Sequence, residues 1–442
     1  MPYRANRQGG TTRLGPRVLE LLRHSLVQNA LSLYGVQIAS YIIPLVTIPY
    51  LARILGASGW GLVAFAQAFG SYLGILGEYG FSLSATREVA RHRDDRDKLT
   101  DIFAGVLGAK LLLAAASILT AILASRWVPV FREHPALLWA AMFGVVGQVF
   151  NMMWFFQGFE RLRLVAGLDV SARILATIGI FFLVRRPENG WRALALQGCG
   201  FVLSSAVGMG LAYRELPFRL PTWKSVWEAL RMGWSMFLFR SSVSLYTTGN
   251  AFVLGLFVAP QFVGYYAGAE KVSKAFLGLL NPIGQSLYPR LSHLVYHARN
   301  RAARLARIGI VVMGAGGTAI GALVFFLAPL FVRIILGKGF EPAVPVLRVL
   351  SLLVPLIAFS GVLGIQWMLP LGLDRAFNTI IVVAGLINLG LAVALAPVYA
   401  DVGMAWAVVI AEACVTGGMY LHLRSRKLDP LSYPAEAEAE VA

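Results

Sequence analysis

The side chains that could do chemistry in this sequence are ionisable groups set inside long apolar stretches. They are Glu78, Lys110, Asp169, Arg173, Arg240, Glu270, Lys271, Lys274 and Glu412. A charged side chain at the centre of a bilayer costs about 3 kcal/mol or more, so such a residue normally faces a water-filled cavity or a partner of opposite charge. The sequence therefore predicts polar cavities between apolar helices, with these residues as candidates for lining them.

The spacing of three charges near residue 270 predicts which of them are paired. Glu270 and Lys274 are four residues apart, in the order that favours an ion pair along one helix. A structural pair and a functional pair are equally consistent with that spacing. Lys271 and Arg240 then remain as cations without a predicted partner.

Four further charges are closer to the ends of their apolar stretches. Asp169 and Arg173 repeat the four-residue spacing, which favours a structural ion pair. Glu78 and Lys110 have glycines nearby and could extend to a membrane interface. Among the carboxylates, we keep Glu270 and Glu78 as candidates for ion coupling.

Cations between apolar helices suit an anionic ligand, because Arg and Lys are the usual partners of phosphate groups. A pyrophosphate-linked lipid would fit, since its charged headgroup cannot enter hydrocarbon unless something replaces its hydration. A soluble anion would fit the same cations. The residue types alone leave that choice open.

Signatures of catalysis and of nucleotide or metal binding are missing. His293 and His297 are four residues apart, but Leu294 stands where a zinc protease needs a glutamate. Residues 335–340 read ILGKGF and lack both the first glycine and the Ser or Thr of a phosphate-binding loop. We expect no enzyme activity, no cofactor and no metal, so any uphill transport would depend on proton or sodium coupling.

The composition indicates which elements must hold these residues. Of 442 residues, 57% are hydrophobic and only 14% are charged, which excludes an ordinary soluble enzyme. Apolar stretches of about 20 residues, the length of a helix that crosses the hydrocarbon, recur along the chain. We predict twelve such helices, at residues 26–50, 60–80, 102–125, 136–157, 167–184, 191–213, 232–258, 262–288, 308–330, 343–369, 376–397 and 401–422.

The distribution of Lys and Arg predicts the orientation, since cytoplasmic loops carry the excess of these residues. Of the 39, 25 fall on the side that holds both termini, 9 on the other side and 5 within the helices. We therefore expect both termini in the cytoplasm, and we attribute the net charge of +17 to topology and anionic lipids rather than to nucleic acid.

An internal repeat predicts two halves. Residues 60–64 and 263–267 match at an offset of 203, which also relates Arg87 to Arg290. With six helices between the copies, the halves run in the same direction, related by a pseudo-twofold axis along the membrane normal. We predict an all-α, polytopic membrane protein with a central cavity between two six-helix lobes, at residues 26–213 and 232–422. A cytoplasmic linker at 214–231 joins them, and a basic tail at 1–25 and a disordered tail at 423–442 flank them.

The chain resembles the bacterial oligosaccharide flippases of polysaccharide biosynthesis, in the superfamily that also holds multidrug exporters and lipid II flippases. The resemblance covers residues 26–424. Its pieces are IPYLARILG at 48–56, GWG at 59–61, EYGF at 78–81, SATRE at 84–88, WFFQGFE at 154–160, VGYY at 263–266, LGKGF at 336–340 and LRVL at 347–350.

The resemblance implies that undecaprenyl-pyrophosphate-linked oligosaccharide is carried across the bacterial inner membrane by alternating access. It implies a substrate site with the cations Arg53, Arg240, Lys271 and Lys274, beside Glu270. We expect a monomer that works with a polysaccharide polymerase and a chain-length regulator. A drug antiporter with an acidic cavity, and a membrane glycosyltransferase or polymerase, are the alternatives.

Overall fold

The computed structural model describes the backbone of residues 16–432 and the side chains of residues 43–432, apart from 162, 239, 242, 245 and 246. Every regular element in this part of the chain is a helix, which confirms the all-α prediction. Most of the predicted N-terminal tail and the last ten residues lie outside the described part. The first helix begins at Pro16, inside the segment predicted as a tail.

Two very long helices each join a pair of predicted spans. Helix α1 (Pro16–Glu78) is interrupted at Gly56, where φ is 66° and ψ is 178°. Helix α17 (Asp374–Ser425) is interrupted at Ala400, where φ is 48° and ψ is −127°. Each of these residues marks a kink between two helices. Positive φ is readily accessible to glycine but uncommon for alanine, so the backbone at Ala400 is strained.

The other helices of the first half follow the predicted spans with one exception. The segment predicted at 136–157 is broken at residues 150–152, between α5 and α6. The bounds are α2 (Phe81–Arg91), α3 (Arg96–Trp127), α4 (Pro129–Glu133), α5 (Pro135–Val149), α6 (Met153–Gly158), α7 (Leu162–Leu183), η1 (Pro187–Asn189) and α8 (Gly190–Glu215).

The second half has more interruptions. The segment predicted at 232–258 is broken after Thr247, and the π-helical segments η3 and η4 interrupt the helices that follow. The bounds are α9 (Trp223–Thr247), α10 (Asn250–Gly255), α11 (Pro260–Leu277), η2 (Gly278–Leu280), α12 (Asn281–His297), α13 (Arg299–Phe326), α14 (Ala328–Phe331), η3 (Val332–Leu336), α15 (Ala343–Ser351), α16 (Leu353–Ser360) and η4 (Gly361–Met368).

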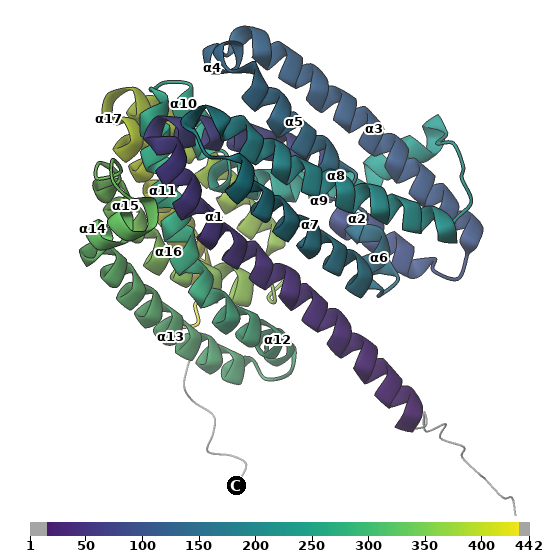
Figure 1. Ribbon diagram of the computed structural model, residues 1–442. Coiled ribbons are helices and arrows are strands. Elements are labelled where there is room, and N and C mark those ends of the chain that lie inside the picture. Colours follow the sequence, from purple (N-terminus) through teal and green to yellow (C-terminus); the bar gives the residue numbers. More distant parts are fainter. Residues whose placement is uncertain (1–15, 433–442) are drawn as a thin grey trace, which may run out of the picture.

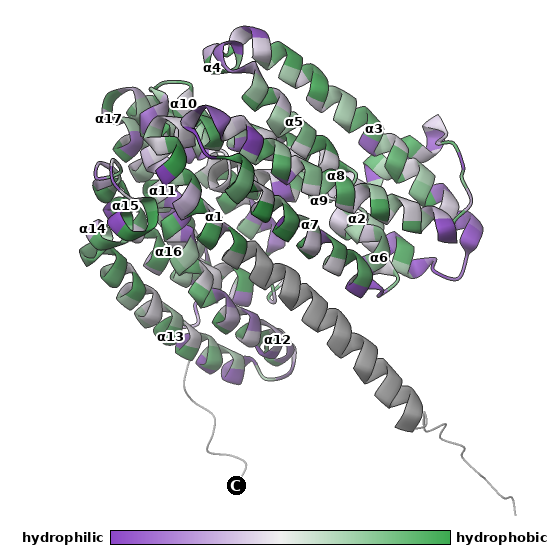
Figure 2. Cartoon of the chain, viewed as in Figure 1, coloured by the Kyte–Doolittle hydropathy of each residue, from purple (hydrophilic) through white to green (hydrophobic). Residues whose placement is uncertain are grey.

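Within the described residues, eight helices are long and apolar enough to cross a membrane. Figure 2 shows apolar residues along the outer faces of these helices, as expected where lipid replaces water. The chain is thus a multi-pass membrane protein. Helix α11 is not among the eight, and it holds Glu270, Lys271 and Lys274 within its 18 residues. The count of twelve spans and the two-lobe division stay predictions.

Helices that are far apart in the sequence lie side by side (Figure 1). Helix α1 packs against α11, and α9 packs against α3 as well as α17. Small residues permit the α3–α9 contact: a Cβ on Gly105 would lie 2.6 Å from the carbonyl oxygen of Ser225. Helix α9, predicted to open the second lobe, therefore also contacts the first, and its first turns occupy residues 223–231 of the predicted linker.

Candidate functional site

Helix α11 contributes to the walls of three cavities, each named here after one lining residue. The Lys271 pocket has a volume of about 160 Å³ and lies between α1, α7, α8 and α11. It is lined by Ile43, Pro44, Thr47, Ile48, Leu51, Trp60, Val63, Gln67, Arg173, Ala176, Thr177, Ile180, Gln197, Phe201 and Lys271. This volume is well above what one water molecule needs, and the polar lining would hold water.

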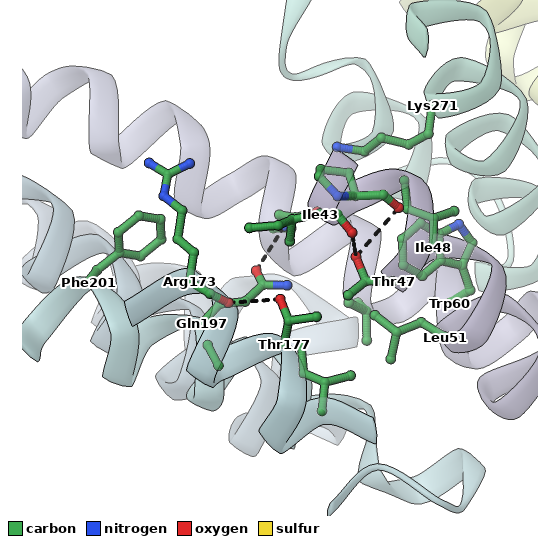
Figure 3. A pocket seen from close by; sticks show the side chains of 15 residues that line it. Ile43, Thr47, Ile48, Leu51, Trp60, Arg173, Thr177, Gln197, Phe201 and Lys271 are labelled. Atoms are coloured by element: carbon green, nitrogen blue, oxygen red, sulfur yellow. Dashed lines mark hydrogen bonds between the residues drawn. The ribbon is translucent and has the colours of Figure 1, made fainter. Parts of the chain in front are cut away.

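Lys271 lies on one side of its pocket, and the amide of Gln197 and the hydroxyl of Thr177 lie on the other (Figure 3). Gln67 donates to Gln197 across 3.2 Å. The ammonium group of Lys271 forms no ion pair or hydrogen bond with any described residue. The prediction that Lys271 is unpaired is therefore confirmed for ion pairs within the described part of the chain, although the charge of Glu270 acts on Lys271 at longer range.

Arg173 reaches the same pocket but is already paired. Its Nε lies 2.9 Å from Oδ2 of Asp169, whose side chain is 2% exposed. Its guanidinium lies 5.6 Å from the centre of the Phe201 ring. These contacts confirm the predicted pair and give Arg173 a structural role.

The Glu412 pocket, which shares no lining residue with the Lys271 pocket, has a volume of about 70 Å³. Glu270 and Lys274 line it and form the predicted ion pair, with 3.0 Å between Oε1 and Nζ. Lys274 also donates to the carbonyl oxygen of Thr247 at 2.9 Å, where α9 breaks. Lys274 thus supplies a donor to an interrupted helix as well as a positive charge to the cavity.

Glu412 is a carboxylate of this pocket that was not assigned a role from the sequence. Its side chain is 5% exposed and accepts a hydrogen bond from Ser360 at 2.6 Å. No ion pair with a described cation accompanies this bond. Its charge inside an apolar stretch was the signal in the sequence. Only the packing of α17 against α11 places it beside Glu270 and Lys274.

The Gln366 pocket is the largest of the three, at about 660 Å³, and lies among α11, α12, α13, α16 and η4. It shares Lys274, Leu277 and Ile357 with the Glu412 pocket. Nothing in the sequence singled out Gln366. Its position in a π-helical segment could not be foreseen from hydropathy.

Arg240 and Glu78 form an ion pair between α9 and the end of α1. The distance from Nη1 to Oε2 is 3.3 Å, and Arg240 also donates to Oγ of Ser82 at 2.7 Å. Glu78 accepts hydrogen bonds from the backbone N–H groups of Gly80 and Ser82, at 3.1 and 2.7 Å, at the start of α2. The prediction that Arg240 has no charge partner is therefore wrong, because Glu78, which the sequence treated separately, is its partner.

Arg53 lies apart from the three pockets. Its side chain is exposed, and Nη2 donates to the carbonyl oxygen of Ile334 within η3. It also lies against Gly337, where a Cβ would be 2.9 Å from Cγ of Arg53. This contact joins the first half of the chain to the second.

Lys110 is buried, with 2% exposure, beside the break between α5 and α6. Its Nζ donates to the carbonyl oxygen of Asn151 at 3.1 Å and lies 5.7 Å from the centre of the Trp154 ring. The expected extension to an interface is therefore wrong. The carbonyl freed by the helix break needs a donor at this depth, and Lys110 supplies it.

Comparison with known proteins places this arrangement among membrane transporters. The family described as polysaccharide biosynthesis protein matches residues 26–295. A relative from Escherichia coli (strain K12), named as an O-antigen transporter, is 31% identical over 406 residues, which cover 91% of this chain and 98% of that protein. A relative from Shigella dysenteriae with the same name is 28% identical over 394 residues, with coverages of 88% and 97%.

Solved structures share the fold. An inward-facing multidrug resistance MATE family transporter of the MOP superfamily aligns with a TM-score of 0.67 and 15% identity, covering 90% of this chain and 99% of that one. An outward-facing structure of such a transporter aligns with a TM-score of 0.51 and 15% identity, with coverages of 93% and 97%. At this identity the likeness establishes a transporter-like fold.

Proposed function

The chain belongs to the polysaccharide biosynthesis protein family, and from that premise we propose that it is a flippase for lipid-linked oligosaccharide. The substrate would be an undecaprenyl-pyrophosphate-linked repeat unit, moved from the inner to the outer leaflet of the bacterial inner membrane. The two relatives named as O-antigen transporters support the coarser assignment, a polysaccharide-related transporter. The carried repeat unit would be used to build O-antigen, capsule or exopolysaccharide.

One observation carries the proposal: Lys271 presents an unpaired cation to a polar cavity between apolar helices. A phosphate oxygen would form the ion pair that this ammonium lacks among the described residues. Lys274, three residues further along α11, presents a second cation to the Glu412 and Gln366 pockets. Arg240 and Arg53 both form contacts between the two halves of the chain. We assign Arg240 to binding phosphate when its ion pair with Glu78 opens. We assign Arg53 to positioning the two halves relative to each other.

Movement of the substrate would follow from rocking of the two halves. Solved structures that share the fold include an inward-facing and an outward-facing conformation, which supports alternating access. The pyrophosphate and sugars would occupy the wet cavities, and the polyprenyl tail would stay in the bilayer. No covalent bond would be made or broken.

Coupling to protons or sodium would use Glu270 and Glu78, with Glu412 beside Glu270 in its pocket. Glu270 is held by Lys274 and Glu78 by Arg240, so a change of protonation or ion binding at either carboxylate would release a cation. The released cation would then be free to bind phosphate, which would change the affinity of the site for the substrate. The pathway would require a polymerase and a chain-length regulator, and we propose a monomer with cytoplasmic termini as the working unit.

The test uses purified protein in liposomes that contain an undecaprenyl-pyrophosphate oligosaccharide in one leaflet. Crossing should be faster than in protein-free liposomes, and both Lys271→Gln and Arg240→Ala should remove the gain. Lys224→Gln, which removes an exposed lysine at the start of α9, is the matched control and should transport normally. Normal crossing by Lys271→Gln would refute the cation site.

The drug antiporter makes a different prediction for the same protein. An antiporter for cationic drugs would favour carboxylates without cationic partners. Glu270 and Glu78 are both paired, whereas Glu412 forms no ion pair with a described residue and is the carboxylate that such an antiporter would use. Proton-driven uptake of a cationic dye, combined with no crossing of any lipid-linked sugar, would favour the antiporter. Release of polymerised or newly glycosylated lipid would favour the enzyme alternative.

A further inference from the structure

The tenth predicted span changes its winding where it borders the Gln366 pocket. Residues 361–368 form the π-helical segment η4, which follows directly on α16. π-Helical segments often occur at functional sites because the wider turn redirects a side chain. Here the redirected segment contains Gln366, whose side chain is only 3% exposed.

The amide of Gln366 is only half satisfied. Its Nε2 lies 3.5 Å from the carbonyl oxygen of Gly284, which is long for a hydrogen bond to oxygen, and 3.5 Å from Sδ of Met313, which is a weak acceptor. Its Oε1 is buried and has no hydrogen-bond partner among the described residues. A buried acceptor without a donor destabilises the fold, so such an atom calls for a ligand that supplies the donor.

The space around this amide is kept open by residues without side chains. Gly284 and Gly361 line the pocket, and a Cβ at Gly284 would lie 3.2 Å from Nε2 of Gln366. The volume of about 660 Å³ falls within the usual range for small-molecule sites. The cavity can therefore hold a ligand much larger than water.

The remaining polar groups of the pocket select the type of ligand. Asn281 and Gln285 add amides, Tyr288 adds an aromatic ring that is 40% exposed, and no carboxylate is among the lining residues. Amides exchange hydrogen bonds with hydroxyl groups, and an aromatic face packs against the C–H face of a sugar ring. Lys274, at the border with the Glu412 pocket, supplies a cation for an adjoining phosphate.

We propose that the Gln366 pocket binds a sugar of the carried oligosaccharide, with a hydroxyl donating to Oε1 of Gln366 and the ring packing on Tyr288. This inference rests on the proposed function and specifies which part of the protein recognises the glycan. Phosphate would be held by Lys271 and Lys274 on α11, and the glycan would extend among α12, α13 and η4.

The experiment compares two kinds of lipid on full-length protein in nanodiscs. The first probe is undecaprenyl pyrophosphate, which has no sugar. The second is a panel of the same lipid bearing one N-acetylglucosamine, glucose or galactose. The wild type should bind at least one glycosylated lipid about tenfold more tightly than the bare lipid.

Gln366→Leu should remove that preference while leaving the affinity for the bare lipid unchanged. Its thermal midpoint should equal or exceed that of the wild type, because the substitution removes an unsatisfied buried acceptor. Tyr288→Ala, at a partly exposed position, should also reduce the preference and does not depend on repacking the interior. Lys271→Gln should weaken both lipids equally.

Two results would overturn the inference: a wild type that binds bare and glycosylated lipids alike, or a preference that survives both Gln366→Leu and Tyr288→Ala. Either could occur while crossing in liposomes remains dependent on the protein and on Lys271, which would leave the flippase assignment intact. Absence of both crossing and lipid binding would instead reject the proposed function, and the sugar site with it.

Discussion

Gly61 on α1 and Gly264 on α11 lie against each other in a reciprocal contact. A Cβ on Gly61 would meet the carbonyl oxygen of Pro260, and a Cβ on Gly264 would meet that of Ala57. The offset of 203 relates Gly61 to Gly264 and Ala57 to Pro260. Equivalent positions that touch each other in this way are expected beside a twofold axis, and small residues let the two backbones approach closely.

This contact predicts that Gly61→Ala and Gly264→Ala destabilise the protein to a similar extent. The added methyl group has no free space, so the helices must separate, at a cost of about 1–3 kcal/mol. Thermal unfolding in detergent would measure the loss. Gly390→Ala is the control, because nothing lies within 4 Å of its added Cβ. Equal midpoints for all three variants would contradict the close contact.

The two partners of the Glu78–Arg240 pair should differ in their contribution to stability. Glu78→Ala removes both the ion pair and the acceptor for two amide groups at the start of α2, so a loss of about 1–2 kcal/mol is expected. Arg240→Ala removes a pair whose arginine is 45% exposed, with an expected loss below about 1 kcal/mol. Chemical unfolding of both variants checks the order. A larger loss for Arg240→Ala would show that the cap contributes little.

Lys110 should be required for stability but not for substrate affinity. Lys110→Ala leaves the carbonyl of Asn151 without its donor, which should cost about 1–3 kcal/mol, besides opening a cavity. Lys110→Met keeps most of the side-chain volume, so the difference between the variants isolates the cavity. Unfolding and lipid-binding measurements on the same samples provide the test. A loss of affinity with unchanged stability would move Lys110 into the substrate site.

Glu412 should influence coupling more than binding. Glu412→Gln retains the shape and a hydrogen bond with Ser360 but cannot exchange a proton, and Glu270, Lys274 and Tyr266 are the titratable groups that line the same pocket. If protons drive transport, an imposed pH gradient should accelerate crossing by the wild type and not by this variant. Ser360→Ala, which leaves the carboxylate in place, is the matched control. Equal acceleration of both variants would exclude Glu412 from coupling.

The local ion pairs could be predicted because helical spacing fixes them. Glu270 with Lys274 and Asp169 with Arg173 are both four residues apart, and any helix brings such side chains onto one face. The all-helical, multi-pass architecture was equally accessible, since a backbone in hydrocarbon must satisfy its own hydrogen bonds. These features depend on the sequence over only a few turns.

Other parts of the candidate site depend on how helices pack across the bundle. The contacts of Arg240 with Glu78 and of Arg53 with Ile334 join residues far apart in the sequence. The helix break that Lys110 supports and the π-helical turn that buries Gln366 are likewise absent from any hydropathy pattern.

By itself, the sequence determined that apolar helices would bring a small set of charges into the membrane. Only the tertiary structure decided that Lys271 stays unpaired while Arg240 and Glu78 meet. The physical reason is that apolar faces are nearly interchangeable in lipid, so close packing of small residues and satisfaction of buried polar groups select the arrangement.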